Sequence, residues 1–137
     1  MKIIFVCTGN TCRSPLAESY ARTKFSTENV VFESRGLMVQ PGGINHISQN
    51  IVERENLVMP SDPAPLTEDD AKEALLLVMT DAHRRAVMGR FPTADVRMIS
   101  EFAEGYEADI LDPYGGGMED YERTFIELKG FIDKFKF

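Results

Sequence analysis

A cysteine and an arginine stand close together near the start of the chain, in residues 7–15, which read Cys-Thr-Gly-Asn-Thr-Cys-Arg-Ser-Pro. A cysteine thiolate is a nucleophile, and a guanidinium can hold two phosphoryl oxygens at once through paired hydrogen bonds. The spacing of Cys7 and Arg13 therefore predicts phosphoryl transfer through a phosphorylated cysteine, with the arginine as the clamp. The plainer alternative is that Cys7 is a small buried side chain and that Gly9 and Asn10 form an ordinary turn.

The residues on either side of this motif predict a strand, a loop and a helix. Residues 3–6 read Ile-Ile-Phe-Val, which is typical of a strand buried on both faces of a parallel sheet. Ser14 is a favourable N-cap, and Pro15 suits the first helical position. Backbone N–H groups at a helix N-terminus bind oxyanions, and Gly9 and Asn10 are residue types that accept the positive φ of a loop curled around a phosphate. We therefore expect a phosphate site between the strand and the helix.

The length and charge of the chain limit its architecture and its partners. With 137 residues and a net charge of −7, we expect a single domain spanning residues 1–137 and a partner other than nucleic acid or an anionic membrane. Local donors, rather than the field of the whole molecule, must hold any anionic substrate. The sequence has no apolar run of membrane-spanning length and no signal-peptide pattern, so we expect a cytoplasmic protein, and a monomer.

The cysteines and histidines exclude several kinds of site. Cys7 and Cys12 lie in the same loop, which is unlike a disulfide framework and fits a reducing compartment. Without a nearby histidine they form no convincing set of metal ligands, so we expect neither a metal ion nor a cofactor. His46 and His83 stand alone in the sequence, which favours a solvated or helix-terminal position for each over a catalytic role.

The order of the periodic segments predicts the fold class. Apolar runs predict further strands at 30–33, 75–79 and 96–99, with a turn at 34–36, and helical spacing predicts helices at 15–25, 46–55, 68–74, 118–135 and after Thr80. Asn45, Thr67 and Thr80 are the expected N-caps of three of these helices. The alternation implies an α/β fold, a three-layer sandwich in which a four-stranded parallel sheet has helices on both faces. Ligands of such sheets bind at the carboxyl ends of the strands.

The longest irregular stretch lies between the last predicted strand and the last predicted helix. Long loops in compact domains are usually functional. A phosphocysteine mechanism needs a group that protonates the leaving group and later deprotonates water, and a carboxyl group suits both tasks. Asp112, which precedes Pro113, is the candidate, and Tyr114 could supply an aromatic wall for a substrate side chain. Asp109 is the competing carboxylate, and an ordinary Asp-Pro turn is the alternative.

Residues 7–15, followed downstream by Asp-Pro-Tyr-Gly-Gly at 112–116, resemble the low-molecular-weight protein tyrosine phosphatases, and the resemblance runs through the whole chain. It implies a role for each of five residues: Cys7 as nucleophile, Arg13 as phosphoryl clamp, Asn10 as the residue that fixes the loop, Ser14 as hydrogen-bond partner of the thiolate, and Asp112 as general acid and then general base. It also implies that phosphate binds in the loop formed by Thr8, Gly9, Asn10, Thr11, Cys12, Arg13 and Ser14. No metal is implied.

Position 11 bears on the choice of substrate. Tyrosine-directed members of this family usually carry an aliphatic residue there, whereas the bacterial protein arginine phosphatases carry threonine, as this chain does at Thr11. A hydroxyl can hydrogen-bond a guanidinium, which an aliphatic side chain cannot, and one buried polar contact can discriminate strongly. The resemblance therefore implies phosphoarginine in proteins as the substrate, with Asp112 also pairing with the guanidinium. The alternative is phosphotyrosine, with Tyr114 as the ring-stacking wall. The chain departs from its relatives at residues 59–65, where they often carry a basic or His-containing segment.

The second cysteine has a possible redox role, and two other functional classes do not fit the sequence. Cys12 resembles the second loop cysteine of the family, which can trap an oxidised Cys7 as a reversible disulfide, although a small packed residue is the alternative. Thioredoxin-coupled arsenate reductases share this loop and fold but need further cysteines downstream, and none follows Cys12. A silent phosphoprotein-binding module would lack the nucleophile, the clamp or the acid, and all three are present.

Overall fold

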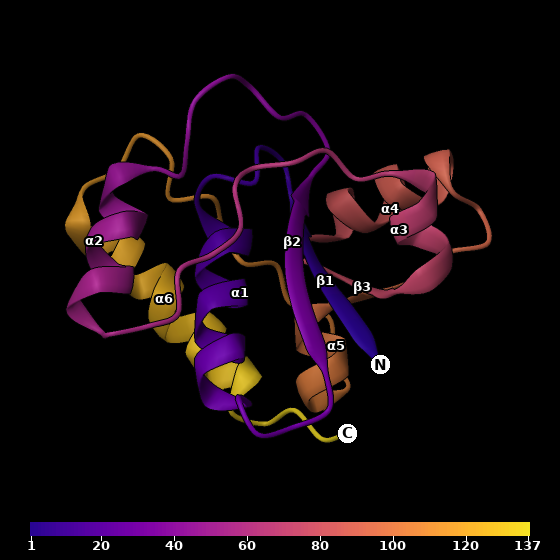
Figure 1. Cartoon of the computed structure of the whole chain (residues 1–137). Coiled ribbons are helices and arrows are strands. Elements are labelled where there is room, and N and C mark those ends of the chain that lie inside the picture. Colours follow the sequence, from indigo (N-terminus) through magenta and orange to yellow (C-terminus); the bar gives the residue numbers. More distant parts are fainter.

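The computed structural model describes residues 1–137 and has a central sheet of four strands, all parallel (Figure 1). Their order across the sheet is β2 (Val31–Gly36), β1 (Lys2–Cys7), β3 (Leu75–Val78) and β4 (Asp95–Met98). Neighbouring parallel strands must be joined by crossover connections, and the helices of this chain supply them. The α/β fold with a four-stranded parallel sheet, predicted from the sequence, is confirmed.

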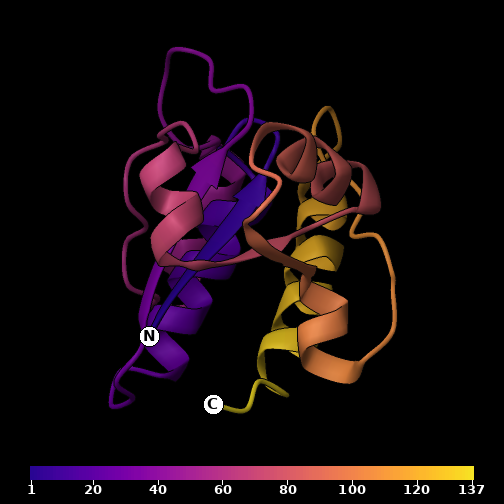
Figure 2. The ribbon, with the colours of Figure 1, turned by 90° about the vertical axis from the view of Figure 1, so that its right-hand side faces the viewer.

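Helices cover both faces of the sheet: α1 (Arg13–Lys24), α2 (His46–Arg54), α3 (Glu68–Glu73), α4 (Asp81–Arg90), α5 (Ile99–Glu104) and α6 (Met118–Ile132). Successive side chains of a strand point to opposite faces, so β1 contributes to two buried clusters. Ile3 and Phe5 pack with α1, α5 and α6, whereas Ile4 and Val6 pack beneath α3 and α4 on the other face. Helix α6 contacts both α1 and α5, and Figure 2 shows α5 and α6 side by side. None of the helices combines the length and apolar composition that crossing a bilayer requires.

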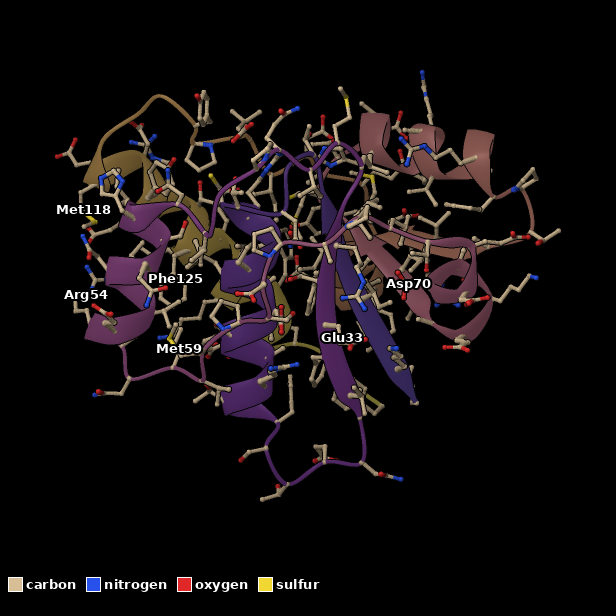
Figure 3. All side chains as sticks on the ribbon, turned by 45° about the horizontal axis from the view of Figure 1, so that its top comes forward. Glu33, Arg54, Met59, Asp70, Met118 and Phe125 are labelled. Atoms are coloured by element: carbon tan, nitrogen blue, oxygen red, sulfur yellow. The ribbon has the colours of Figure 1, made fainter.

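Two ion pairs connect elements that are distant in the sequence. Arg35 of β2 binds Asp70 of α3 at 3.0 Å and Glu33 of its own strand at 3.4 Å. Arg54, at the end of α2 and labelled in Figure 3, pairs with Glu122 of α6 and so connects these two helices. The Arg54–Glu122 pair is well solvated, so it fixes orientation more than it adds stability, whereas Arg35 and Asp70 are largely buried.

The second strand is longer than predicted. The expected turn at 34–36 belongs to β2, in which Phe32, Ser34 and Gly36 face inward. Ser34 is tolerated inside because its hydroxyl donates to the buried carboxylate of Glu18 in α1. Parallel pairing of the strand, up to Cys7 opposite Gly36, therefore prevails over the local turn preference of Ser-Arg-Gly.

Two helices also differ from the expectations. The stretch after β4, which was expected to be irregular, begins with a short helix, α5; its N-cap residue, Met98, has no capping side chain, and Gly105 ends it at a φ of 80°. Helix α6 ends at Ile132 rather than at residue 135. The caps predicted at Asn45, Thr67 and Thr80 are all present.

The carboxyl ends of the strands meet at one edge of the sheet, at the top of Figure 1. The loop after β1, the loop after β2 and the segment that leads into α6 all gather there. Because β1 is flanked by β2 on one side and β3 on the other, the chain reverses its direction of winding at this strand, which is where ligands of open α/β sheets bind.

Gly36 allows the end of β2 to pack directly against the loop after β1. A Cβ atom at this position would lie 2.7 Å from Val39 Cγ2 and 3.0 Å from both Asn10 Cβ and the backbone carbon of Gly9. We expect Gly36→Ala to lower the free energy of unfolding by about 1–3 kcal/mol, because the backbone must move apart. Denaturant unfolding monitored by circular dichroism measures this change.

Gly130→Ala is the matched control, because a Cβ at Gly130, inside α6, would meet no atom within 4 Å. Replacing a helical glycine by alanine should raise stability by about 0.5–1 kcal/mol. Equal stabilities for Gly36→Ala and the wild type would contradict the close packing described above.

Candidate active site

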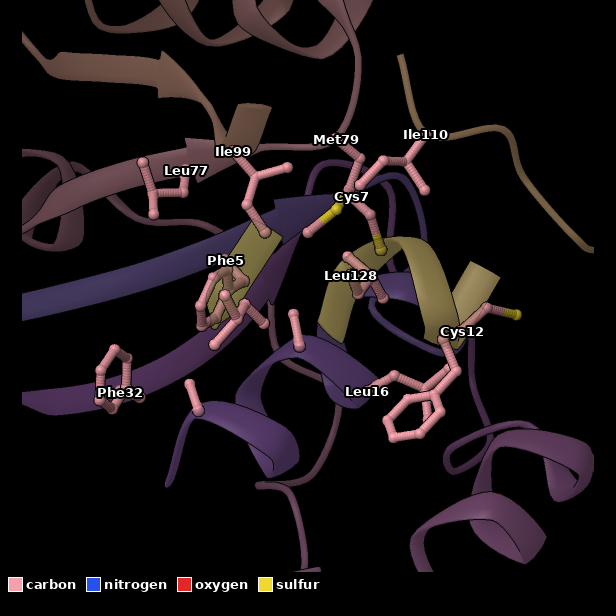
Figure 4. Packing of buried hydrophobic residues seen from close by; sticks show 14 of the residues in the cluster. Phe5, Cys7, Cys12, Leu16, Phe32, Leu77, Met79, Ile99, Ile110 and Leu128 are labelled. Carbon is pink, nitrogen blue, oxygen red and sulfur yellow. The ribbon is translucent and has the colours of Figure 1, made fainter. Parts of the chain in front are cut away.

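The loop between β1 and α1 surrounds the sulfur of Cys7. This residue is 2% exposed, and its Sγ atom lies 2.9 Å from Oγ of Ser14. Figure 4 shows Cys7 among the buried residues, near Met79 and Ile110. Asn10 donates from Nδ2 to the same Ser14 oxygen at 2.8 Å. Because Ser14 Oγ accepts from Asn10, its own hydrogen is free to be donated to the sulfur, which would stabilise a thiolate there.

Asn10 holds the loop in shape from the inside. It is fully buried and has a φ of 57°, and its Oδ1 accepts a hydrogen bond from the backbone N–H of Ala64 at 3.0 Å. Gly9, which was also expected to take a positive φ, does not. One residue in the left-handed region is therefore enough to curl this loop, and the amide of Asn10 links it to residues 63–65.

Arg13 is the first residue of α1 and is 4% exposed. Its Nη1 donates to the backbone oxygen of Ile110 at 2.8 Å, and its Nη2 lies 3.6 Å from Oδ2 of Asp112. The Nε atom is buried without a hydrogen-bond partner. An unpartnered buried donor is costly, so the site is built to receive an acceptor there.

The start of α1 differs from the expectation in a way that serves an anion. The helix begins at Arg13 with Cys12 as N-cap, and no side chain caps it. Ser14, the predicted N-cap, is turned inward toward Cys7 instead. The first turn contains no acidic residue. Its backbone N–H groups and the positive end of the helix dipole therefore remain available to an anionic ligand.

Asp112 lies beside the loop, and Asp109 does not. The Asp112 side chain is 50% exposed, and its Oδ1 accepts a hydrogen bond from the backbone N–H of Tyr114 at 3.0 Å. Asp109, the competing carboxylate, accepts a hydrogen bond from the backbone N–H of Asp81 at 2.9 Å, at the start of α4. Of the two carboxylates, only Asp112 lines the pocket described next.

A pocket of about 390 Å³ opens above Cys7. It is lined by Cys7, Thr8, Gly9, Thr11, Cys12, Arg13, Met38, Gln40, Asp112 and Tyr114. Tyr114 and Met38 are 78% and 64% exposed, so they form the outer rim. The described residues contain no group of three or more His, Cys, Asp or Glu side chains placed to hold a metal ion.

Met38 and Gln40 were not among the residues predicted from the sequence. They belong to the loop after β2, whose backbone is fastened to the loop after β1: Met38 N–H donates to Thr8 O at 2.8 Å, and Asn45 N–H donates to Thr11 O at 2.9 Å. The signal that could have found them is topological, because a loop that leaves the carboxyl end of a strand adjacent to β1 must pass the same site.

Thr11 and Cys12 follow one another but face different surroundings. Thr11 is half-buried and lines the pocket, and its hydroxyl has only a long contact of 3.7 Å with Cys12 Sγ. Cys12 is 6% exposed, with its Sγ 3.5 Å from the hydroxyl oxygen of Tyr121 in α6. Burial raises the pKa of the Cys12 thiol, and the hydrogen bond from Tyr121 opposes this rise. Cys7 and Cys12 are both free thiols here.

His83 was expected to be solvated or to lie at a helix end. Both histidines do lie at the start of a helix: His46 is exposed at the first position of α2, whereas His83, in the first turn of α4, is 7% exposed and therefore not solvated. Its Nε2 is 2.9 Å from the hydroxyl oxygen of Thr8. Burial, helped by the positive charge of Arg13, lowers the pKa of His83 to about 4. The position of His83, shortly after the carboxyl end of β3, was the sequence signal that could have placed it near the site.

Comparisons with known proteins identify the family of this fold. Residues 2–136 match the sequence model of the family described as low molecular weight phosphotyrosine protein phosphatase. The chain belongs to this phosphatase family. A curated relative, the low molecular weight protein-tyrosine-phosphatase PtpB of Staphylococcus epidermidis, is 37% identical over 139 residues, which cover 100% of this chain and 98% of the relative.

Solved structures of family members are similar in fold over almost the whole chain. The YwlE arginine phosphatase from Geobacillus stearothermophilus is 31% identical with a TM-score of 0.91, and the match covers 97% of this phosphatase and 88% of that chain. A YwlE arginine phosphatase mutant with a phosphorylated active-site serine also has a TM-score of 0.91, with 32% identity and coverage of 98% and 92%.

The lowered pKa of His83 predicts a dependence of stability on pH. As the pH falls below the ordinary value of 6.5, the unfolded chain takes up a proton at this histidine before the folded protein does. The free energy of unfolding of the wild type, relative to His83→Gln, should therefore decrease between pH 6.5 and about 4, where the folded protein is protonated as well. Denaturant unfolding of both proteins across this range is the measurement. Parallel pH profiles would contradict a buried neutral imidazole.

Proposed function

We propose that this phosphatase removes phosphate from phosphoarginine in proteins through a phosphocysteine intermediate. The observation that carries the proposal is the Thr11 hydroxyl, which lines the pocket and has no short hydrogen bond within the protein. It lies in the same pocket as Cys7, Arg13 and Asp112, which supply a nucleophile, a cation and a carboxyl group.

In the first step, the Cys7 thiolate attacks the phosphorus atom. A sulfur–phosphorus bond forms while the phosphorus–nitrogen bond to the guanidine breaks, and the protonated carboxyl of Asp112 gives its proton to the departing nitrogen. Arg13 and the backbone N–H groups of the loop hold the phosphoryl oxygens, whose charge they stabilise during the transfer. Asp112 is close enough to the clamp for this role, at 3.6 Å from Arg13 Nη2.

In the second step, the carboxylate of Asp112 takes a proton from a water molecule, and the oxygen of that water attacks the phosphorus atom. The phosphorus–sulfur bond breaks, releasing inorganic phosphate and the Cys7 thiolate. Ser14, whose Oγ lies 2.9 Å from the sulfur, donates a hydrogen bond to the leaving thiolate. The solved YwlE mutant, which carries phosphate on its active-site serine, supports a covalent intermediate at the equivalent place.

Three side chains of the pocket suit a guanidine leaving group. Thr11 offers a hydroxyl acceptor, and the half-exposed carboxyl group of Asp112 can accept from a guanidine N–H at one oxygen while the other carries the proton to be transferred. The exposed ring of Tyr114 can lie against the flat face of a guanidinium. The likeness to two solved arginine phosphatases adds to this support.

Phosphotyrosine is the second candidate substrate. Tyr114, at the rim of the pocket and 78% exposed, is placed to stack on a phenyl ring as well as on a guanidinium. The curated relative from Staphylococcus epidermidis is named as a tyrosine phosphatase. Under either substrate the partners are phosphorylated proteins. We propose a cytoplasmic location, because the nucleophile must remain a reduced thiol. We also propose that the enzyme acts as a monomer.

Substitution at Thr11 tests the choice of substrate. We expect Thr11→Val, which has nearly the same shape without the hydroxyl, to lower kcat/KM for phosphoarginine peptides about tenfold or more, because a guanidinium N–H loses its partner. Thr11→Ile should in addition move the preference toward phosphotyrosine peptides. Steady-state turnover of both peptide classes measures these effects, with Thr11→Ser as the variant that keeps the hydroxyl. A preference of the wild type for phosphotyrosine peptides would contradict phosphoarginine as the substrate.

Substitution at Asp112 tests the general acid. Asp112→Asn should lower kcat for phosphoarginine by about 10²–10⁴-fold, because the departing guanidine is a strong base that needs a proton. The loss should be smaller for p-nitrophenyl phosphate, whose leaving group departs as an anion. Asp109→Asn is the matched control, since Asp109 binds the start of α4 and does not line the pocket. The assignment fails if the two variants lose activity equally.

A further inference from the structure

His83 is a buried titratable side chain, adjacent to the candidate active site, that the mechanism above does not use. Its Nε2 lies 2.9 Å from Oγ1 of Thr8, the residue that directly follows Cys7 and lines the pocket. Thr8 itself is exposed to the pocket, whereas His83 is 7% exposed and sits on α4, behind the loop. A single hydrogen bond therefore connects α4 to the first residue of the anion-binding loop.

The partners of the imidazole decide which way this hydrogen bond runs. The Nδ1 atom is buried without a hydrogen-bond partner. In the tautomer with hydrogen on Nδ1, an N–H donor would be buried unpaired, whereas in the tautomer with hydrogen on Nε2, only an acceptor is left unpaired. Buried donors without partners are the rarer case in proteins. The structure therefore favours an Nε2–H group that donates to the oxygen of Thr8.

This direction determines what Thr8 can offer to the pocket. If Thr8 accepts from His83, its own hydroxyl hydrogen is free, and a hydroxyl that already accepts a hydrogen bond is a stronger donor. If Thr8 instead donated to His83, it could present only lone pairs, which repel phosphoryl oxygens. The pocket beside Thr8 contains Arg13 and the N-terminus of α1, so the group it suits is an anion.

We propose that His83 is a positioning residue that turns the hydroxyl of Thr8 into a hydrogen-bond donor to the phosphoryl group bound above Cys7. The inference rests on the proposed phosphatase function and adds a contact to it, through a histidine that does not itself touch the substrate. The contact is made to the phosphoryl oxygens, so it is present in the substrate complex, in the intermediate and in the complex with inorganic phosphate.

Burial, helped by one nearby charge and opposed by two, keeps the imidazole of His83 neutral in the free enzyme. Arg13 faces it from α1 and disfavours a second proton, while Asp109 and Asp112 face it from the segment before α6 and favour one; together with burial, the balance holds the pKa near 4. A bound phosphate adds negative charge on the side of Arg13. The pKa of His83 should therefore rise when phosphate binds.

Inorganic phosphate is a suitable probe, because its binding does not depend on which phosphorylated side chain is the substrate. We expect Thr8→Val to weaken phosphate binding about three- to tenfold, as for the loss of one hydrogen bond, and Thr8→Ser to weaken it less because the hydroxyl remains. His83→Leu should cost a similar factor, whereas His83→Gln, whose side-chain amide nitrogen can occupy the place of Nε2, should cost less. Competition against p-nitrophenyl phosphate measures each affinity.

The double variant separates positioning from general support of the fold. If His83 acts through Thr8, His83→Leu should have no further effect on phosphate affinity once Thr8 is valine. Independent, multiplicative losses would overturn the proposal. Thermal melting of each variant checks that the protein used is folded. If His83→Leu does not fold, Thr8→Val still tests the proposal, because Thr8 is exposed and can be replaced without disturbing the core.

Nitrogen-15 NMR of the imidazole reads the tautomer directly. We expect His83 to carry its hydrogen on Nε2 in the free enzyme at neutral pH and its pKa to move upward on addition of phosphate. A hydrogen on Nδ1, or a titration unaffected by phosphate, would overturn the inference. If the wild type binds no phosphate, the proposed function itself fails; if it binds phosphate and all four single variants bind it as tightly, only the role of His83 and Thr8 fails.

Discussion

The site depends on the hydrogen bonds that run from Asn10 through Ser14 to the sulfur of Cys7. Each member is at most 2% exposed, so no water competes for these bonds. The left-handed φ of Asn10 curls the loop, and its side-chain amide reaches both Ser14 and Ala64. The same residue therefore sets the shape of the phosphate cradle, orients the partner of the nucleophile and ties the cradle to the chain at residues 63–65.

The part of the site that is contiguous in sequence could be predicted from it. Cys7 and Arg13 are recognisable because five residues between a strand and a helix give the chain few ways to arrange them. Asp112 could be found because proline and glycine mark its loop, although only the structure separates it from Asp109, which binds the start of α4. The buried strands could also be predicted, because a strand covered on both faces is almost entirely apolar in composition.

The features that escaped prediction depend on contacts between distant segments. Ser34 and Gly36 look like a turn, but pairing with β1 and a hydrogen bond to the buried Glu18 keep them in a strand. Helix α5 is short and its N-cap residue, Met98, offers no capping side chain, so the only local signals were Glu101, which accepts a hydrogen bond from the Met98 N–H, and Gly105 at the end of the helix. His83 does lie in the first turn of a helix, but its burial and its hydrogen bond to Thr8, which is distant in the sequence, could not be predicted from its neighbours along the chain.

The loop after β2 does more than form one side of the pocket. Its N–H groups hold the carbonyl oxygens of Cys7, Thr8 and Thr11 away from the ligand, at 3.0, 2.8 and 2.9 Å. Within a planar trans peptide, the carbonyl of one residue and the N–H of the next point in opposite directions. Outward carbonyls at these positions therefore orient the N–H groups of Thr8, Gly9 and Cys12 inward. Main-chain contacts from the loop after β2 thus set the N–H groups that bind the phosphoryl group. The side chains of that loop at the rim of the pocket can therefore differ with the substrate, while the peptide planes of the phosphate-binding loop stay fixed.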